Sequence, residues 1–202
     1  MYDPNPAGAN RYLYHWMSPE RLERFAARGT LKPYWRHWVY DLGGFARGIS
    51  TAFDPAEWMP REDEGVPGEP CIVIDRHAFE HRAIEITSGE TYHLTRSIHA
   101  AMKRKSDIGP ILASVERSRK TTFGTMDEMF VLDPIPAEAI AAIGFEPDRM
   151  YFEDLQVITA AAEKWNVPLI RMDGWLECSP DIDELDAVIE RAIGSPHERR
   201  YF

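Results

Sequence analysis

Three short segments place hydrogen-bonding, hydroxyl and carboxyl side chains at the edges of apolar runs. Residues 14–17 put His15 between aromatic side chains, and an imidazole donates and accepts hydrogen bonds at fixed angles. Ser50 and Thr51 lie in a second run, and Glu128 follows a polar stretch and directly precedes a third. A carboxylate accepts hydrogen bonds, and hydroxyl groups both donate and accept them, so these side chains could bind a polar ligand.

Taken singly, each of these residues has an ordinary structural role. A lone histidine among aromatic side chains is most often a core or surface residue, and a Ser-Thr pair is an ordinary way to begin a strand. Glu128 alone is typical of a solvated carboxylate at the end of a strand. Only the order of the three segments along the chain favours a shared functional site.

Helix and strand patterns place these segments beside regular elements. A helix is predicted at residues 19–29, where Ser18 can cap it, Pro19 occupies its first turn and Gly29 can end it. Strands are predicted at residues 48–52, 71–74, 83–86, 128–132, 139–145 and 168–172. Further helices are predicted at residues 94–118, with a break near residues 109–110, at residues 152–165, and at residues 182–193 after a cap at Asp181.

Length and composition favour one folded domain. The chain has 202 residues, of which 44% are hydrophobic and 28% are charged, so it can bury a sizeable core. Helices and strands follow each other without a recognisable linker. We therefore predict a single α+β domain over residues 1–202, with a core at residues 12–145 and a C-terminal βα extension at residues 152–202.

The charge balance argues against non-specific nucleic-acid binding by the chain as a whole. With 23 Lys and Arg against 33 Asp and Glu, the formal net charge is −10, and phosphates are repelled overall. A local basic patch can overcome this repulsion, and the Lys-Arg-Lys run at residues 103–105 is a candidate, although such a run is usually a solvated helix face.

Targeting signals are not evident. No apolar run reaches the roughly 18 residues of a membrane span, and residues 1–10 lack the basic and apolar parts of a secretion signal. Cys71 and Cys178 are too few for a disulfide framework and lack the surroundings of a nucleophile. We therefore expect a cytoplasmic protein without a membrane partner.

Metal and phosphate-loop motifs do not account for the three segments. His77 and His81 are four residues apart, as on one helix face, but no third ligand accompanies them, so we predict no metal site. The sequence has neither a GxxxxGKS/T nor a GxGxxG phosphate loop, which argues against nucleotide binding by those two routes.

The order of the motifs resembles the ADP-ribosyltransferase superfamily, which includes diphtheria-toxin-like enzymes, bacterial and phage mono-ADP-ribosyltransferases and poly-ADP-ribose polymerases. The resemblance is based on the Tyr14-His15 pair, ARGTLKP at residues 27–33, ARGISTAFDP at residues 46–55 and DEMFVLDPIP at residues 127–136. The resemblance implies a split mixed β-sheet core with flanking helices, in which three motifs on separate strands meet at one NAD-binding cleft.

This resemblance implies a transferase that consumes NAD and passes ADP-ribose to a macromolecular acceptor, either protein or nucleic acid. Glu128 is the expected catalytic residue, because a carboxylate can stabilise the oxocarbenium-like centre left when nicotinamide departs. Ser50 and Thr51 would organise Glu128 and the nicotinamide ribose through their hydroxyl groups. Residues 117–126 match the position of the family's acceptor-recognition loop.

The remaining expected contacts surround the two ends of NAD. His15 would hydrogen-bond the adenosine-side ribose, and the backbone of Tyr14 or Trp16 would hold the nicotinamide amide. Phe53 or Tyr40 would stack on the nicotinamide ring.

The sequence departs from the arginine-modifying members of the family. They carry an acidic or amide residue two positions before the catalytic Glu, where this chain has Met126 with Asp127 beside it, which argues against arginine as the acceptor. Two alternatives are an RNA 2′-phosphotransferase-like enzyme, which has a related fold and also consumes NAD, and a non-catalytic acidic binding module on the same scaffold.

Overall fold

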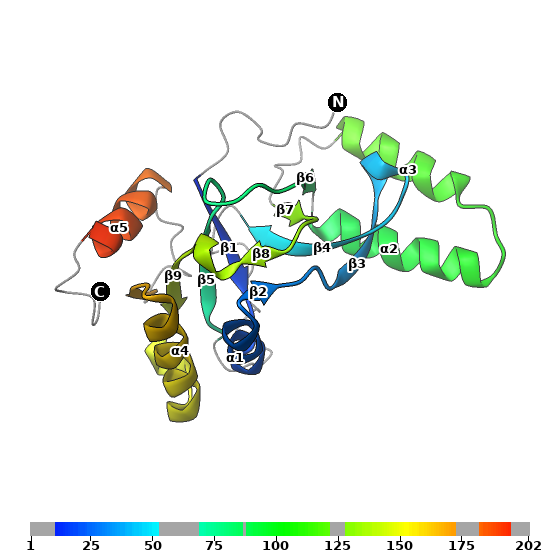
Figure 1. Cartoon of the computed structure of the whole chain (residues 1–202). Coiled ribbons are helices and arrows are strands. Elements are labelled where there is room, and N and C mark those ends of the chain that lie inside the picture. The colour runs from blue at the N-terminus through cyan, green and yellow to red at the C-terminus, as the bar shows by residue number, and fades with distance from the viewer. Residues whose placement is uncertain (1–10, 53–68, 87, 122–127, 173–181, 195–202) are drawn as a thin grey trace. The chain divides into compact units, whose positions relative to one another are not determined.

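The computed structural model describes residues 11–52, 69–86, 88–121, 128–172 and 182–194, and Figure 1 shows the arrangement of their elements. This part of the chain is mixed α and β, with five α-helices and both parallel and antiparallel strand pairs. Its contacts divide the chain into two compact units. Unit 1 comprises residues 1–4, 32–50 and 81–133, and unit 2 comprises residues 5–31, 51–80 and 134–202.

Unit 2 is built on a mixed sheet with the strand order β10-β9-β5-β1. Its strands are β1 (Tyr12–Trp16), β5 (Cys71–Asp75), β9 (Ile140–Phe145) and β10 (Leu169–Arg171). Strand β5 is antiparallel to β1 and β9, whereas β10 runs parallel to β9. On the other side of β1, Ala52 at the end of β4 (Gly44–Ala52) pairs with Tyr14. A separate short ladder joins β2 (Thr30–Leu31) to β8 (Ile135–Pro136).

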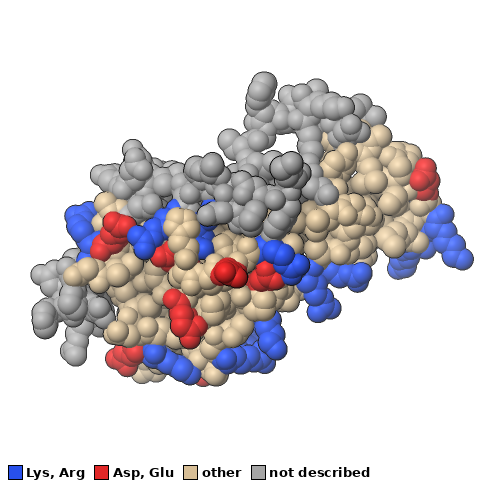
Figure 2. Space-filling view, turned by 45° about the horizontal axis from the view of Figure 1, so that its top comes forward, with Lys and Arg blue, Asp and Glu red and all other residues tan. Residues whose placement is uncertain are grey.

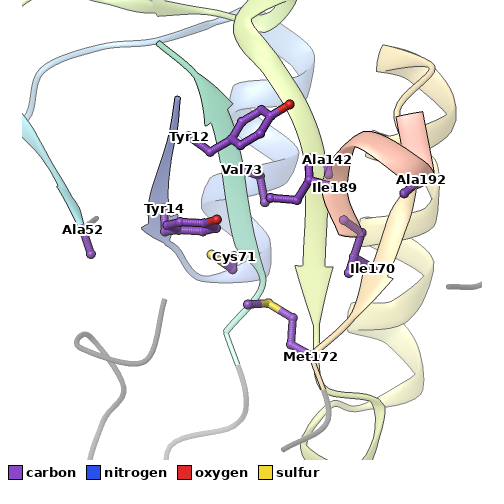
Figure 3. Packing of buried hydrophobic residues seen from close by; sticks show 10 residues of the cluster. All are labelled: Tyr12, Tyr14, Ala52, Cys71, Val73, Ala142, Ile170, Met172, Ile189 and Ala192. Carbon is purple, nitrogen blue, oxygen red and sulfur yellow. The ribbon is translucent and has the colours of Figure 1, made fainter. Parts of the chain in front are cut away.

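Helices cover both faces of this sheet. Helix α5 (Ile182–Gly194) packs Ile189 and Ala192 against one face, where they share a buried cluster with side chains from β1, β5, β9 and β10 (Figure 3). Helix α4 (Phe152–Trp165) connects the parallel strands β9 and β10, as such a pair requires. The buried side chains of α4 are absent from the α5 cluster, which places α4 on the opposite face.

Helix α1 (Pro19–Arg28) packs with α4 through Phe25 and Trp165, whose ring centroids lie 4.8 Å apart. The predicted end signals are present, because Pro19 stands in the first turn and Gly29 ends the helix with a left-handed φ of 71°. Ser18 occupies the N-cap position, but its side chain makes no hydrogen bond to a helix N–H. Its hydroxyl instead hydrogen-bonds Glu20 and lowers the pKa of that carboxyl group.

Unit 1 contains a group of neighbouring strands around β4. Strand β3 (Trp35–Val39) pairs with the first half of β4, β4 is also a sheet neighbour of β7 (Glu128–Val131), and β7 pairs with β6 (Ala83–Ile86). The helices are α2 (Ser88–Lys103) and α3 (Gly109–Thr121). Trp38 packs with Leu94 and Ile98 of α2, and the Thr95 hydroxyl accepts a hydrogen bond of 2.8 Å from the Trp38 N–H.

The predicted mixture of helices and strands is confirmed, with shifts at some boundaries. The helical region near residues 94–118 divides into α2 and α3 at the predicted break, but α2 already begins at Ser88. Strand β3 was not predicted, and β4 starts before residue 48. The described residues also form the short 3-10 helices η1 (Tyr40–Leu42), η4 (Ala137–Ala139) and η5 (Pro147–Arg149). The C-terminal strand and helix join unit 2, whereas Asp181 lies outside the described residues.

Candidate functional site

In unit 2, the structure brings His15 and Thr51 onto adjacent strands. Tyr14 of β1 pairs with Ala52 of β4 in an antiparallel register, so His15 and Thr51 are opposite each other one position further along. Tyr14 and Ala52 both contact the cluster beneath α5. Because neighbouring residues of a strand alternate in direction, His15 and Thr51 share the other face. Their residues are 4% and 1% exposed, so both belong to a tightly packed strand pair.

Cys71 lies beside this pair but is not suited to nucleophilic chemistry. It stands opposite Trp16 in the β1–β5 register and is fully buried. Burial raises the pKa of the Cys71 thiol, and a hydrogen bond from the backbone of His15 offsets only part of this effect. The thiolate form is therefore suppressed, and Cys71 contributes packing volume instead.

In unit 1, the other two predicted elements of the site lie on neighbouring strands. Ser50 belongs to β4 and is 6% exposed, and Glu128 is the first residue of the adjacent strand β7. The contact between these strands is close at Gly48, where a Cβ atom would lie 2.6 Å from Cε1 of the Phe130 ring. Gly48 and Ser50 are two positions apart, so they lie on the same face of β4.

Strand alternation separates the two predicted hydroxyl groups. Ser50 follows the face of Gly48 and Phe130, whereas Thr51 follows the face of His15. Adjacent residues in an extended strand cannot both point to the same side. The two hydroxyl groups therefore lie on opposite faces of β4 and are suited to different contacts.

A row of aromatic side chains accompanies Gly48 and Phe130 in unit 1. Trp35 pairs with Gly48 across the β3–β4 ladder and is 45% exposed. The Trp35 ring stacks near His37 with a centroid distance of 5.7 Å, and the His37 ring meets the edge of Phe130 at 5.5 Å. Burial lowers the pKa of His37, whose Nδ1 lies 3.4 Å from the Thr95 hydroxyl. The Thr95 hydroxyl already accepts from Trp38, so its proton is available to His37.

The structure also places the other residues considered from the sequence. Tyr14 is 2% exposed, and Trp16 packs at the margin of the α5 cluster. Tyr40 packs against the cluster around Trp38 rather than beside Gly48. Phe53 lies outside the described residues.

The expected acceptor-recognition loop begins in a helix. Residues 117–121 form the end of α3, and residues 122–127 lie outside the described part of the chain. The segment that contains His77 consists of turns and bends rather than a helix, so the sharing of one helix face by His77 and His81 is wrong. Among the described residues, no group of three metal-ligating side chains occurs.

Sequence reasoning missed Trp35, His37 and Phe130 as neighbours of the candidate site. Their signal was weak, because aromatic residues in a strand are most often core, and β3 itself was not predicted. Gly48 was part of the motif, but its closeness to Phe130 depends on pairing between β4 and β7, which the sequence does not display.

A separate cavity of about 630 Å³ lies in unit 2 beside α4 and β10, lined by Phe145, Phe152, Leu155 and Arg171 among others. None of the predicted site residues lines it. Within the described ranges, no helix has the length and apolar character that crossing a bilayer requires. No protein-family model matches the chain, and no curated protein sequence matches it.

Proposed function

We propose that the protein is an NAD-dependent mono-ADP-ribosyltransferase, which breaks the nicotinamide–ribose bond and passes ADP-ribose to a macromolecular nucleophile. The observation that supports this most is the pairing in unit 1. Strand β4, which carries Ser50, is the neighbour of β7, which begins at Glu128. Two segments far apart in the sequence thus place Ser50 and Glu128 on neighbouring strands.

The proposed chemistry uses the different properties of these two groups. Departure of nicotinamide leaves positive charge on the ribose carbon, and the Glu128 carboxylate stabilises that charge electrostatically. The Ser50 hydroxyl donates a hydrogen bond that orients the carboxylate. Nicotinamide takes the electron pair of the broken carbon–nitrogen bond. The acceptor's nucleophilic atom then bonds to the ribose carbon and gives its proton to water.

The aromatic row beside Gly48 suits the flat nicotinamide ring. Trp35 is 45% exposed, whereas the Phe130 ring fills the space over Gly48, so a ligand would stack on Trp35 rather than on the strand at Gly48. In this proposal Trp35 takes the stacking role that the sequence resemblance gives to Phe53 or Tyr40. Ring stacking of this kind contributes about 1 kcal/mol beyond the burial of apolar area.

His15 keeps the role that the sequence resemblance gives it, a hydrogen bond to the adenosine-side ribose. His15 and Thr51, side by side on β1 and β4, supply an imidazole and a hydroxyl group that can both donate and accept. The proposal assigns NAD binding to this pair and the chemical step to Glu128. It therefore predicts separable kinetic effects, with His15 acting on the affinity for NAD and Glu128 on the chemical step.

The test is a reaction with NAD labelled in its adenosine part, with and without cell lysate, following nicotinamide release and label on protein and nucleic acid. Glu128→Gln should lower kcat by about 100-fold or more. His15→Ala should mainly raise KM. The exposed Glu138 in η4 provides a matched control, since Glu138→Gln removes the same charge elsewhere and should leave both parameters unchanged.

The outcomes separate the possible activities. Label transferred by the wild type but not by Glu128→Gln supports the transferase and reveals the acceptor fraction. Nicotinamide release without transfer in any acceptor fraction would indicate a glycohydrolase. A folded protein that neither binds NAD nor releases nicotinamide would overturn the proposal and leave the binding module as the better interpretation.

A further inference from the structure

The net negative charge of the chain is unevenly divided between the two units. Unit 1 contains 11 Lys and Arg against nine Asp and Glu, whereas unit 2 contains 12 against 24. The formal charges are therefore +2 and −12, which together give the −10 of the whole chain. The overall composition predicts repulsion of polyanions, and this repulsion is expected of unit 2. Unit 1, with its net positive charge, can attract polyanions.

Two arginines of unit 1 stand directly opposite each other on adjacent strands. Arg36 of β3 pairs with Arg47 of β4, and both residues are exposed. Like charges in such a cross-strand position destabilise a sheet. Of the ion pairs formed by described residues, none includes either guanidinium group. An anion bound between them would remove the repulsion.

The Phe45 ring connects these arginines to helix α2. The Arg36 guanidinium carbon lies 4.7 Å from the Phe45 ring centroid, and the His99 ring of α2 lies 4.7 Å from the same centroid. Trp38 meets Phe45 edge-on at 5.1 Å, so the ring is already surrounded and serves as a support. The cation–π contact holds Arg36 beside the helix.

Helix α2 continues the line of positive charge. Arg96 and Lys103 are three and four residues from His99, so these side chains are neighbours on the helix surface. Arg104 and Lys105 follow directly after the helix, and all four cations are exposed. Arg36, Arg47, Arg96, Lys103, Arg104 and Lys105 make up what we call the basic strip. Among the described residues, none of the six forms an ion pair.

Lys105 has a backbone conformation that favours glycine. Its φ is 55°, in the left-handed region, and its N–H bonds the carbonyl oxygen of Met102 as α2 ends. Glycine is the usual residue in this position, and a side chain costs about 1 kcal/mol there. Attraction to the helix C-terminus explains part of the charge at residues 103–105, but it explains neither the strained Lys105 nor the Arg36–Arg47 pair.

We propose that the basic strip binds the sugar–phosphate backbone of a nucleic acid. From Arg96 to Lys103 the strip follows α2 for roughly 10 Å, given 1.5 Å per residue, and Arg104 and Lys105 extend it, so it is too long for one small phosphate to neutralise. On the part of the surface formed by α2 and α3 that Figure 2 shows, Lys and Arg predominate over Asp and Glu. Successive phosphates of a strand match this spaced row of cations, and the contacts carry no sequence preference.

Nucleic-acid binding by the basic strip can be measured without NAD. The result is therefore independent of the proposed transferase activity. Fluorescence anisotropy with a labelled single-stranded RNA, a single-stranded DNA and a duplex, over a series of salt concentrations, gives both affinity and its salt dependence. The wild type should bind at low salt, and its affinity should fall steeply as salt rises. Arg36→Gln with Arg47→Gln should weaken binding about tenfold and reduce the salt slope by about two, one for each lost phosphate contact.

A matched control removes the same charge from unit 2. Arg24 and Arg28 are exposed on α1, so Arg24→Gln with Arg28→Gln lowers the net charge equally and should leave binding unchanged. Equal loss in both double variants, or unchanged binding in the strip variant, would overturn the proposal. Binding to anionic phospholipid vesicles without binding to any oligonucleotide would also overturn it.

A substitution at Lys105 distinguishes a role in nucleic-acid binding from a role in stability. Lys105→Gly removes both the positive charge and the backbone strain, so it should raise Tm while weakening oligonucleotide binding. A purely structural role for residues 103–105 would give the first effect without the second. Unchanged oligonucleotide affinity in a more stable Lys105→Gly protein would therefore argue against the strip.

Discussion

Gly48→Ala tests the close contact between β4 and β7, on which the candidate site depends. The added Cβ would lie 2.6, 2.7 and 2.8 Å from three carbons of the Phe130 ring. Carbon atoms in contact prefer a separation of about 3.5–4.0 Å, so the ring must move by roughly 1 Å. Phe130 is fully buried, meets His37 at its edge and packs with Val39 and Ile84, so its neighbours must move as well.

Two opposing effects set the expected magnitude. Replacing a strand glycine by alanine reduces the entropy of the unfolded chain and favours folding by about 0.5–1 kcal/mol. Overpacking of a buried site costs about 1–3 kcal/mol, and the second effect should exceed the first. A net loss near 1–2 kcal/mol corresponds to a fall in Tm of roughly 2–8 °C for a chain of this size. Calorimetry of both proteins measures this shift.

A double-mutant cycle identifies the cause. Phe130→Leu alone removes packing, but in the Gly48→Ala background it also makes room for the new methyl group, so the two losses should not add, with a coupling of about 1 kcal/mol. Gly44→Ala is the control on the same strand, because a Cβ there meets only the Leu42 carbonyl oxygen at 3.9 Å. A rise in Tm for Gly48→Ala, or strict additivity with Phe130→Leu, would refute the reasoning.

Two further predictions follow from the described ionisable groups. Cys71 is fully buried with a raised thiol pKa, so a Cys178→Ser protein should react with a thiol reagent only on unfolding; fast labelling at pH 8 in the native state would contradict this. Asp133 is held by Arg82, whose N–H groups hydrogen-bond its carboxylate at 2.6–3.2 Å and lower its pKa. Because the folded pKa lies below the unfolded value, the stability from this pair is present above about pH 4 and is lost as pH falls further. Asp133→Asn should therefore lower Tm at pH 7 but little at pH 3, whereas Asp148→Asn, at an exposed position, should give no such pH-dependent difference.

Local signals predicted the elements whose pattern is regular. The apolar run at residues 71–74 predicted β5, which extends one residue further to Asp75, and the Pro19 and Gly29 signals predicted α1 nearly to the residue. Strand β3 was missed because Trp35–Val39 mixes aromatic, basic and aliphatic residues without a clear alternation. The start of α2 was predicted too late, because its first turns contain Ser88, Gly89 and Thr91, which are poor helix formers.

The sequence names the candidate residues, which stay predictions, but it does not show how they are arranged. The period of a strand alone implies that Ser50 and Thr51 face opposite sides, yet only the pairing of Tyr14 with Ala52 shows that Thr51 accompanies His15. The basic strip could not be read from sequence, because Arg36, Arg47 and residues 96–105 belong to separate elements. Their proximity depends on the β3–β4 ladder and on the contact of Phe45 with His99.

The interleaving of the two units along the chain has a consequence for folding during synthesis. Strand β5 needs β9 on one side, and Ile72 pairs with Ile143, yet residues 81–133 of unit 1 are translated between them. Every segment of unit 1 is therefore available before β9 emerges, while one edge of β5 still has unsatisfied backbone groups. Such an edge invites pairing with other chains. The unpaired edge of β5 stays exposed until β9 has been synthesised. A pause in synthesis just before β9 would therefore lengthen this exposure and favour aggregation.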